Sequence, residues 1–186
     1  MKKIPTIFER DWAGDRSRVL DKPVAECAWV FAGEGNPTRK WDGTAVLMRG
    51  GRMFKRYELR PPNKTPPDGF EYADIPDPET GRQPGWVPVG DGPEDKWHRE
   101  ALDSGFADGT YELVGPKVQG NPERFDRHLL LRHGADRVLD TVRGFNILRA
   151  LLEREPIEGL VWHHPDGRMA KIKRRDFGLP WPPDKP

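Results

Sequence analysis

Cysteine is almost absent from this sequence, since Cys27 is the single cysteine among 186 residues. A lone cysteine excludes an internal disulfide framework and any zinc site built from several cysteines. The sequence also has no apolar run near the ~18 residues that a membrane-spanning helix needs, and residues 1–5 lack the apolar stretch of a signal peptide. We therefore expect a soluble, cytoplasmic protein with no membrane contact.

An excess of charge of one sign is missing as well, because the net charge is +1 although 33% of the residues are charged. The chain as a whole therefore does not attract nucleic acid, and any such binding must come from local patches. The length fits one domain with a proper core, to which 7 tryptophans and 8 phenylalanines contribute large buried areas. We expect a monomer with a single domain over residues 1–178 and an extended tail over residues 179–186.

Proline is concentrated in residues 61–95, which contain nine prolines, eight acidic residues and two basic residues. So much proline excludes a long helix or a central strand. The aromatic residues Phe70, Tyr72 and Trp86 indicate that part of this acidic insertion packs on the domain, either as surface structure or as a lid. Residues 168–175 contain five basic residues among eight, which fits phosphate contacts or a solvated charged face.

The pattern of apolar residues and turns predicts more strands than helices. The Gly-Gly pair at residues 50–51 and the segment 164–167 are typical of tight hairpin turns. The expected strands are Thr44–Met48, Met53–Leu59, Gly109–Val114, Ile157–His163 and Arg168–Arg174. The expected helices are Glu94–Ser104 and Asp136–Glu153, although Gly144 interrupts the apolar spacing of the second. This combination predicts an α+β fold with mostly antiparallel sheets and flanking helices.

Four short segments, each weak alone, are informative together. They are Lys40-Trp41-Asp42-Gly43, Tyr111-Glu112-Leu113-Val114-Gly115, Glu158-Gly159-Leu160-Val161 and Lys171-Ile172-Lys173. In this order and at these spacings they resemble motifs I, III, IV and V of the covalent nucleotidyltransferase superfamily, which contains polynucleotide ligases and mRNA capping enzymes. The resemblance spans roughly residues 40–175. It implies the nucleotidyltransferase fold of a ligase adenylation domain.

Other segments resemble one branch of that superfamily, the small single-domain 5′-to-3′ RNA ligases. These segments are Arg60–Lys64, Pro84–Val89, Asn121-Pro122, His128–Leu130 and His133–Ala135. The resemblance implies ATP-dependent sealing of a 5′-phosphate RNA end to a 3′-hydroxyl RNA end, as in RNA repair. Because 13 residues follow Lys173, we expect no OB-fold domain, which argues against a capping enzyme.

Lys40 is the candidate nucleophile, and the resemblance implies that it forms a lysyl-AMP intermediate. An attacking lysine must be neutral, yet a lysine of ordinary pKa is neutral only about once in 2,500 at pH 7. Burial, neighbouring cations and a metal raise that neutral fraction. Lys171 and Lys173 are two residues apart on an expected strand, so their side chains face the same way. Paired cations of this kind suit a triphosphate and disfavour protonation of a nearby lysine.

Carboxylates are the candidates for binding the metal and the ribose. Glu158, with Asp42 as a second candidate, would hold Mg²⁺ or Mn²⁺ against the phosphates of ATP, because hard oxygen ligands suit such cations. The metal and the lysines would stabilise charge that develops on the pyrophosphate leaving group. Glu112 would accept hydrogen bonds from the ribose hydroxyls, as the resemblance implies.

Arginine and aromatic candidates complete the expected nucleotide site. Arg56 and Arg60 lie after motif I, where related ligases carry an arginine that engages a phosphate, and a planar guanidinium suits bidentate phosphate binding. We prefer Arg60, and Arg56 stays open. His128 and Leu130 are the candidates for stacking on adenine, and neither is a clear match.

The expected reaction has three steps. Lys40 attacks the α-phosphorus of ATP and releases pyrophosphate, AMP passes to the RNA 5′-phosphate, and the 3′-hydroxyl then displaces AMP. Two alternatives stay open, namely a small ATP-dependent DNA ligase and a non-catalytic module that binds nucleotide or nucleic acid with the same fold. The set of lysines and glutamates argues against the second, because a binding module has no need of a reactive lysine.

Overall fold

The structure is a computed structural model that describes residues 3–60, 65–78, 80–103, 105–138 and 142–183. Contacts between Cα atoms divide the chain into two compact units. Unit 1 comprises residues 1–3 and 42–133, and unit 2 comprises residues 4–41 and 134–186. Unit 2 is therefore assembled from the two ends of the chain. The expectation of one domain over residues 1–178 stays a prediction.

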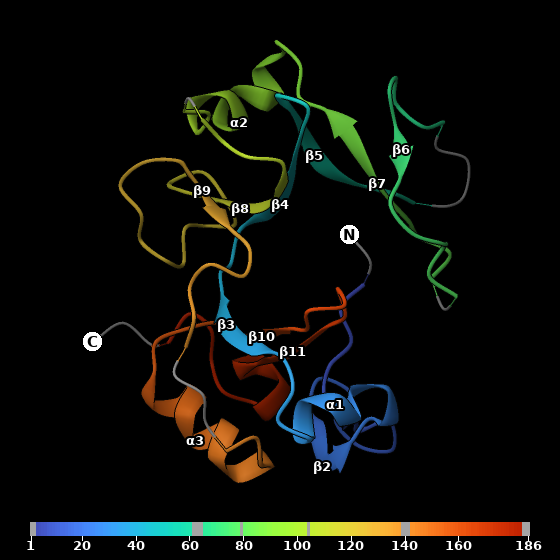
Figure 1. The fold of residues 1–186 in the computed structure, drawn as a ribbon, viewed down its shortest axis with the longest axis vertical. Helices are drawn as coiled ribbons and strands as arrows, with labels where there is room; N and C mark the ends of the chain where they lie inside the picture. The colour runs from blue at the N-terminus through green and yellow to red at the C-terminus, as the bar shows by residue number, and fades with distance from the viewer. Residues whose placement is uncertain (1–2, 61–64, 79, 104, 139–141, 184–186) are drawn as a thin grey trace. The chain divides into compact units, whose positions relative to one another are not determined.

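A six-stranded antiparallel sheet forms the centre of unit 1, with the strand order β6-β7-β5-β4-β8-β9 (Figure 1). Its strands are β4 (Thr44–Arg49), β5 (Arg52–Leu59), β6 (Glu71–Tyr72), β7 (Gln83–Pro88), β8 (Gly109–Val114) and β9 (Leu129–Arg132). The β4–β5 hairpin turns at Gly50 and Gly51, whose φ angles of 55° and 71° suit glycine. The sequence prediction of this hairpin and of β8 is confirmed.

The prediction that residues 61–95 hold no central strand was wrong, because β7 pairs with β5 on one side and with β6 on the other. Backbone geometry explains how Pro84 and Pro88 are tolerated there. The N–H of Val89 donates to β5 at 2.9 Å, whereas the carbonyl of Pro84 accepts from Ala73 on the β6 side at 3.0 Å. Backbone groups of successive residues point to opposite sides of a strand, so the positions of Pro84 and Pro88 face β6. The N–H groups that these prolines lack cost little there, because β6 pairs over two residues only.

The helical part of unit 1 is shorter than the sequence predicted. The expected helix Glu94–Ser104 is a 3-10 turn, η2 (Pro93–Asp95), followed by a five-residue helix, α2 (Lys96–Glu100). Unit 1 has its own apolar core beside the sheet. That core contains Val46, Met48, Met53, Ala101, Tyr111, Leu113, Val118 and Leu130.

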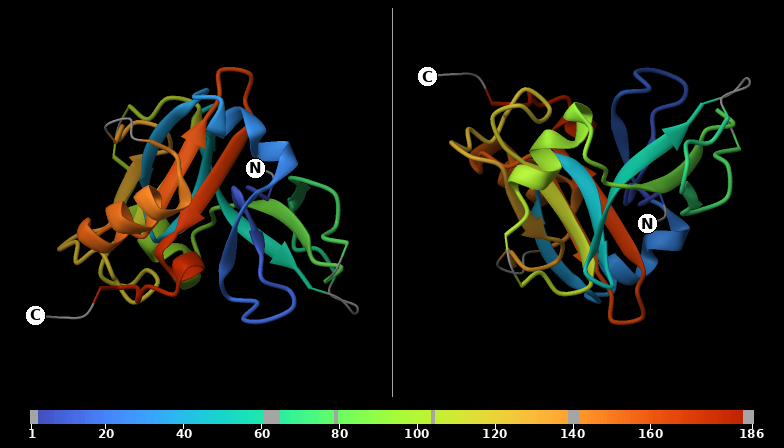
Figure 2. Two further views of the ribbon diagram at one scale, coloured as in Figure 1. Left: turned by 90° about the horizontal axis from the view of Figure 1, so that it is seen from below. Right: turned by 90° about the horizontal axis from the view of Figure 1, so that it is seen from above.

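Unit 2 contains a three-stranded antiparallel sheet of order β11-β10-β3 and a separate pair β1-β2. The strands are β1 (Phe8–Arg10), β2 (Val19–Pro23), β3 (Asn36–Lys40), β10 (Gly159–His163) and β11 (Met169–Lys173). The helices are η1 (Ala25–Cys27), α1 (Ala28–Phe31), α3 (Phe145–Arg154) and η3 (Arg174–Phe177). The β10–β11 hairpin is confirmed, and α3 lies across one face of its sheet in the left view of Figure 2.

The expected helix Asp136–Glu153 begins later, at Phe145, so the prediction was wrong for its first part; residues 139–141 lie outside the described residues. Residues 136–138 pair with β3 instead, through Arg39 N–H to the Asp136 carbonyl at 2.9 Å and Val138 N–H to the Pro37 carbonyl at 3.0 Å. Gly144 precedes the helix in an extended conformation. Long-range strand pairing therefore outweighed the local helical spacing of apolar residues.

Unit 2 is stabilised by apolar packing and by one buried arginine. Leu148 and Leu152 on α3 are fully buried in a core with Leu160 and Trp162 of β10. Arg174 is 4% exposed. Its guanidinium donates to the main-chain carbonyls of Leu152, Glu155 and Pro180. At least this member of the basic run 168–175 therefore holds α3 and the C-terminal segment in place rather than facing solvent or phosphate.

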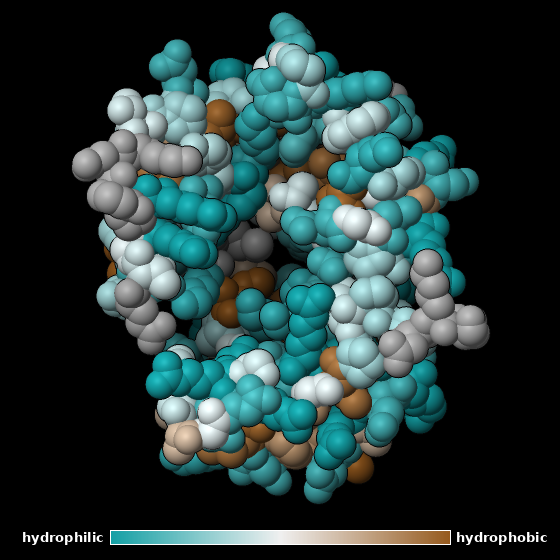
Figure 3. Space-filling view, turned by 180° about the vertical axis from the view of Figure 1, so that it is seen from behind, coloured by the Kyte–Doolittle hydropathy of each residue, from teal (hydrophilic) through white to brown (hydrophobic). Residues whose placement is uncertain are grey.

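These elements confirm an α+β class with mostly antiparallel sheets and few short helices. The longest helix in the described ranges, α3, has ten residues, so no described helix could cross a membrane. Hydrophilic side chains cover most of the face in Figure 3, and apolar side chains appear there in small groups. This surface agrees with a composition in which 33% of residues are charged.

Candidate functional site

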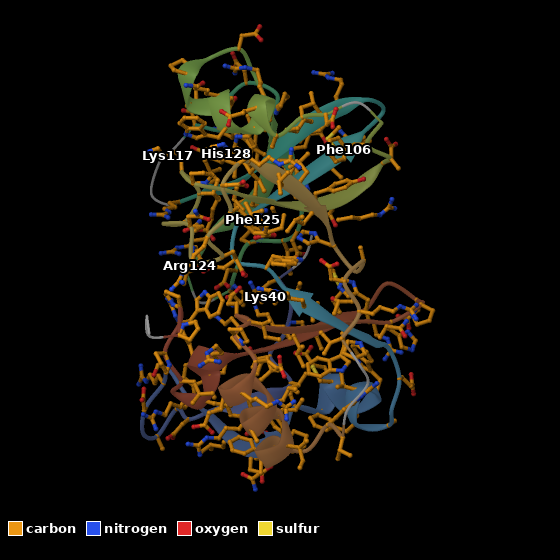
Figure 4. All side chains as sticks on the ribbon, turned by 90° about the vertical axis from the view of Figure 1, so that its left-hand side faces the viewer. Lys40, Phe106, Lys117, Arg124, Phe125 and His128 are labelled. Atoms are coloured by element: carbon orange, nitrogen blue, oxygen red, sulfur yellow. The ribbon has the colours of Figure 1, made fainter. Side chains whose placement is uncertain are left out.

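The three predicted catalytic lysines share one face of the sheet β11-β10-β3. Lys40 at the end of β3 and Lys173 at the end of β11 are both aligned with Gly159 of β10. Residues aligned across antiparallel strands point to the same face, and Lys171 lies two residues before Lys173 and points the same way. We call this surface the lysine face; Figure 4 labels Lys40 at the end of its strand.

The opposite face of the same sheet belongs to the core of unit 2. Leu160 and Ile172, which alternate with the residues of the lysine face, are fully buried. Gly159 lies between Lys40 and Lys173 in the cross-strand row. A β-carbon on Gly159 would overlap the carbonyl oxygen of Ile172, so the close approach of β10 and β11 requires glycine here. The glycine of motif IV is thus explained by the close packing of two strands.

Glu158 contacts the candidate nucleophile directly. The Lys40 Nζ donates to Glu158 Oε2 at 2.5 Å, a short charge-assisted hydrogen bond. The two side chains are 23% and 11% exposed, so the pair is shielded but reachable. The main-chain carbonyl of Glu158 accepts from the N–H of Arg174 at 2.9 Å, which fixes the backbone beside β11. Two residues 118 positions apart in sequence are thereby brought together.

Lys171 is the most perturbed titratable group on the lysine face. Burial, together with the neighbouring cations Lys173 and Lys40, lowers the pKa of Lys171 to about 8, and Asp176 and Glu158 oppose the shift. Asp176 is 1% exposed, and its carboxylate accepts from Arg10 Nη2 at 2.6 Å and from the N–H of Lys173 at 2.8 Å. The lysine face is therefore a partly buried concentration of positive charge, which suits a polyphosphate.

Trp41, the residue after the candidate nucleophile, is held on two sides. Its indole Nε1 donates to Asp136 Oδ2 at 2.8 Å, and the guanidinium carbon of Arg39 lies 3.8 Å from the centroid of its ring. The Arg39 N–H also donates to the Asp136 carbonyl at 2.9 Å. These contacts fix the backbone on both sides of Lys40.

A second group of predicted residues lies in unit 1 around Glu112. Glu112 Oε1 accepts from the N–H of Gly43 at 3.0 Å, and Glu112 Oε2 lies 2.8 Å from His133 Nε2. A β-carbon on Gly43 would overlap the Leu113 carbonyl, so the glycine of motif I is required beside β8. Each carboxylate oxygen keeps further acceptor capacity. Glu112 is thus a fixed acceptor whose remaining lone pairs are open to a hydroxyl donor.

His128 is a buried packing residue of unit 1, 5% exposed. Its ring stacks on Trp97 with centroids 4.7 Å apart. Its Nδ1 donates to Glu100 Oε1 at 2.9 Å, and its Nε2 accepts from the N–H of Lys117 at 3.3 Å. A β-carbon on Gly115 would overlap this imidazole, which explains the glycine that ends motif III. The prediction that His128 stacks on adenine stays a prediction.

The remaining predicted residues also lie in unit 1. Burial lowers the pKa of the Arg56 guanidinium, which lies 5.5 Å from the ring of Trp86, while Glu58 opposes the shift. The Arg60 side chain is 64% exposed and lies 3.7 Å from Glu58. Asp42 is partly buried. The roles predicted for Arg56, Arg60 and Asp42 stay predictions.

Two residues that sequence reasoning missed orient the predicted ones. His133 holds Glu112, and Asp136 holds Trp41. His133 belongs to the segment His133–Ala135 that resembled RNA ligases, but it had no assigned role there, and Asp136 was assigned to the expected helix Asp136–Glu153. Their partners lie 21 and 95 residues away, a separation that no local pattern reveals.

A divalent cation fits this arrangement with a single protein carboxylate. No group of three or more His, Cys, Asp or Glu side chains in the described ranges could hold a metal. Mg²⁺ typically keeps several waters and binds one or two carboxylates together with substrate phosphates. Glu158, a carboxylate beside Lys40 with its side chain 11% exposed, suits that mode.

The family model described as RNA ligase 1 matches residues 100–186, which include motifs III, IV and V. The chain is 33% identical to RNA ligase 1 of Mus musculus over 144 residues, covering 58% of this chain and 44% of the relative. RNA ligase 1 of Pongo abelii and of Danio rerio are 32% and 30% identical over the same coverage.

The matched part of the chain spans less than half the length of these curated relatives. Both comparisons nevertheless agree on one kind of protein, and the family match covers Glu112, Glu158 and the two motif V lysines. By both comparisons the chain is related to the RNA ligase 1 proteins, which confirms the resemblance to RNA ligases that its motifs indicate.

Proposed function

We propose that this protein is an ATP-dependent RNA ligase that joins 5′-phosphate and 3′-hydroxyl RNA ends through a lysyl-AMP on Lys40. The observation that carries the proposal is the Lys40 amine, 2.5 Å from Glu158, on a face that also carries Lys171 and Lys173. The relationship to RNA ligase 1 proteins supports RNA as the substrate. The two compact units correspond in this proposal to an adenylyltransferase of the ligase type.

In the first step, the Lys40 amine loses a proton and its lone pair attacks the α-phosphorus of ATP. A nitrogen–phosphorus bond forms, and the bond from that phosphorus to pyrophosphate breaks. Glu158 accepts the hydrogen bond that orients the amine. Lys171 and Lys173 stabilise the negative charge that develops on pyrophosphate. A divalent cation held by Glu158 supplies further charge neutralisation when bound.

In the second step, an oxygen of the RNA 5′-phosphate attacks the phosphorus of AMP, and the nitrogen–phosphorus bond breaks. Lys40 leaves as an amine and takes up a proton. In the third step, the RNA 3′-hydroxyl attacks the activated 5′-phosphorus and AMP leaves. The covalent intermediate divides one hard condensation into three displacements.

Glu112 binds the ribose of the nucleotide in this proposal. Both of its oxygens are already oriented, one by the N–H of Gly43 and one by His133, so the side chain does not have to be ordered when the nucleotide binds. The remaining lone pairs accept from the ribose hydroxyls.

A labelling experiment tests the enzyme proposal. The protein is incubated with Mg²⁺ and ATP labelled at the α-phosphate, and a denaturing gel should show a covalent AMP band. The band should be lost in Lys40→Arg and retained in Lys22→Arg, a matched change on an exposed strand of the same unit. Labelled protein without dependence on Lys40 would contradict the proposal.

A sealing assay separates the substrates. A nicked RNA hairpin with 5′-phosphate and 3′-hydroxyl ends should be sealed faster than the matching nicked DNA. Faster DNA sealing would favour the small DNA ligase, and a covalent AMP band without any sealing would favour a module that has lost turnover.

A further inference from the structure

The loop over residues 115–128, between β8 and β9, is a rigid feature that the reaction described above leaves unused. Three consecutive turns organise it, through the hydrogen bonds Val118 N–H to Gly115 O at 3.0 Å, Asn121 N–H to Val118 O at 2.7 Å and Arg124 N–H to Asn121 O at 3.0 Å. The Asn121 side chain then binds the backbone of Phe125 twice, with both distances 2.9 Å. These bonds fix the backbone from which the side chains of the loop project.

The loop also contains backbone strain. Gln119, Asn121 and Arg124 have φ angles of 48°, 54° and 58°, and within the described ranges they are the only residues other than glycine with positive φ. Such residues are unfavourable in the folded chain, and they gather at binding and active sites. Asparagine tolerates this conformation, whereas arginine has no such preference. One of the three strained positions, Arg124, presents a cation.

Three cations of the loop face solvent, namely Lys117, Arg124 and Arg127. In the part of the chain that the structure describes, none of them forms an ion pair with an acid. Figure 4 shows Lys117 and Arg124 along one edge of unit 1, with Phe125 and His128 further in. Lysine and arginine side chains combined with aromatic side chains are typical of surfaces that bind single-stranded nucleic acid.

We propose that the loop 115–128 is a docking surface for the phosphate backbone of single-stranded RNA. This inference rests on the proposed function, because it names where the substrate of that same enzyme is held. A chain with a net charge of +1 has no general attraction for RNA, so its binding must come from a local cluster of this kind. Lys117 and Arg124 each neutralise one phosphate. The Asn121 hydrogen bonds hold the backbone beside Arg124, and the Lys117 N–H donates to His128.

Salt dependence of RNA binding measures these contacts directly. For single strands, the slope of log K against log salt is about −0.7 for each phosphate contact. The double variant Lys117→Gln/Arg124→Gln should therefore have a slope shallower by about 1.4 with a fluorescent single-stranded RNA that carries a 5′-phosphate. Glutamine keeps the side-chain length and already occupies the same backbone conformation at Gln119. The matched control is Arg149→Gln on the exposed side of α3, which should leave the slope unchanged.

Labelling with ATP in the absence of RNA keeps the two proposals distinguishable. The double variant should form lysyl-AMP at the wild-type rate, because neither residue lies on the lysine face. Normal labelling with an unchanged slope would overturn the docking surface and leave the enzyme proposal intact. A shallower slope in the variant, when neither the wild type nor the variant forms lysyl-AMP, would support the docking surface and contradict the enzyme proposal. Asn121→Ala should weaken RNA binding several-fold although it removes no charge, and unaltered binding would show that the loop does not need its bracing.

Discussion

Replacing Lys171 by methionine should stabilise the folded protein at neutral pH. Burial, with Lys173 and Lys40 nearby, lowers the pKa of Lys171 from 10.5 to about 8. Each pKa unit corresponds to about 1.4 kcal/mol of free energy, so the protonated side chain costs about 3 kcal/mol when the protein folds at pH 7. Methionine has a similar shape and no charge, so the substitution removes this cost.

The sign of the effect follows from the two pKa values. Below pH 8 the lysine is protonated in both the folded and the unfolded state, and the full cost is present. Between pH 8 and 10.5 the folded state releases its proton while the unfolded state keeps it, so the wild-type protein becomes more stable as pH rises. The advantage of Lys171→Met should therefore be largest at pH 8 and below and should vanish as pH approaches 10.5.

Urea unfolding of wild type and Lys171→Met without nucleotide measures this difference across that pH range. Lys22→Met is the control, since its side chain is 65% exposed and its replacement should change stability by no more than about 0.5 kcal/mol. The reasoning that burial of this ammonium costs free energy would be refuted by either of two results. Lys171→Met could be less stable than wild type at neutral pH, or its gain in unfolding free energy could be the same at every pH.

The other predictions concern the residues around the nucleophile. Gly159→Ala should destabilise the protein by roughly 1–3 kcal/mol, because the new methyl group overlaps the Ile172 carbonyl. Thermal unfolding would detect this loss, and an unchanged melting temperature would contradict the close approach of β10 and β11. Asp136→Leu should slow lysyl-AMP formation about tenfold by releasing Trp41. Asp136→Asn keeps an acceptor for the indole and should form lysyl-AMP at close to the wild-type rate. Equal rates of lysyl-AMP formation in the two variants would show that this hydrogen bond does not position Lys40. Glu158→Gln should reduce labelling by orders of magnitude, and near wild-type labelling would mean that this carboxylate has another role.

Local chemistry was sufficient to predict the hairpins and the lysine face. The Gly-Gly pair at residues 50–51 requires positive φ angles, and it produced the turn that the sequence indicated. Lys171 and Lys173 face the same way because side chains alternate along a strand. The register that aligns Lys40 with Lys173 across Gly159 depends on tertiary structure and could not be read from the sequence. The resemblance of the motifs nevertheless indicated that these residues would lie in one site.

Other features could not be predicted because they depend on partners distant in sequence. Residues 136–138 have helical apolar spacing with α3, yet their backbone pairs with β3. Pro84 and Pro88 exclude a strand with two fully paired sides, but β6 is so short that β7 loses little. The hydrogen bond from His133 to Glu112 and the burial of Arg174 likewise arise only when the units fold.

The most direct test of the account is to find which residue carries AMP. The protein is incubated with ATP and Mg²⁺, digested under conditions that preserve the nitrogen–phosphorus bond, and analysed by mass spectrometry. We predict AMP on Lys40 alone, with the modification abolished by Lys40→Arg. AMP attached to Lys171 or Lys173 with Lys40 unmodified, or no covalent AMP in the correctly folded protein, would contradict it.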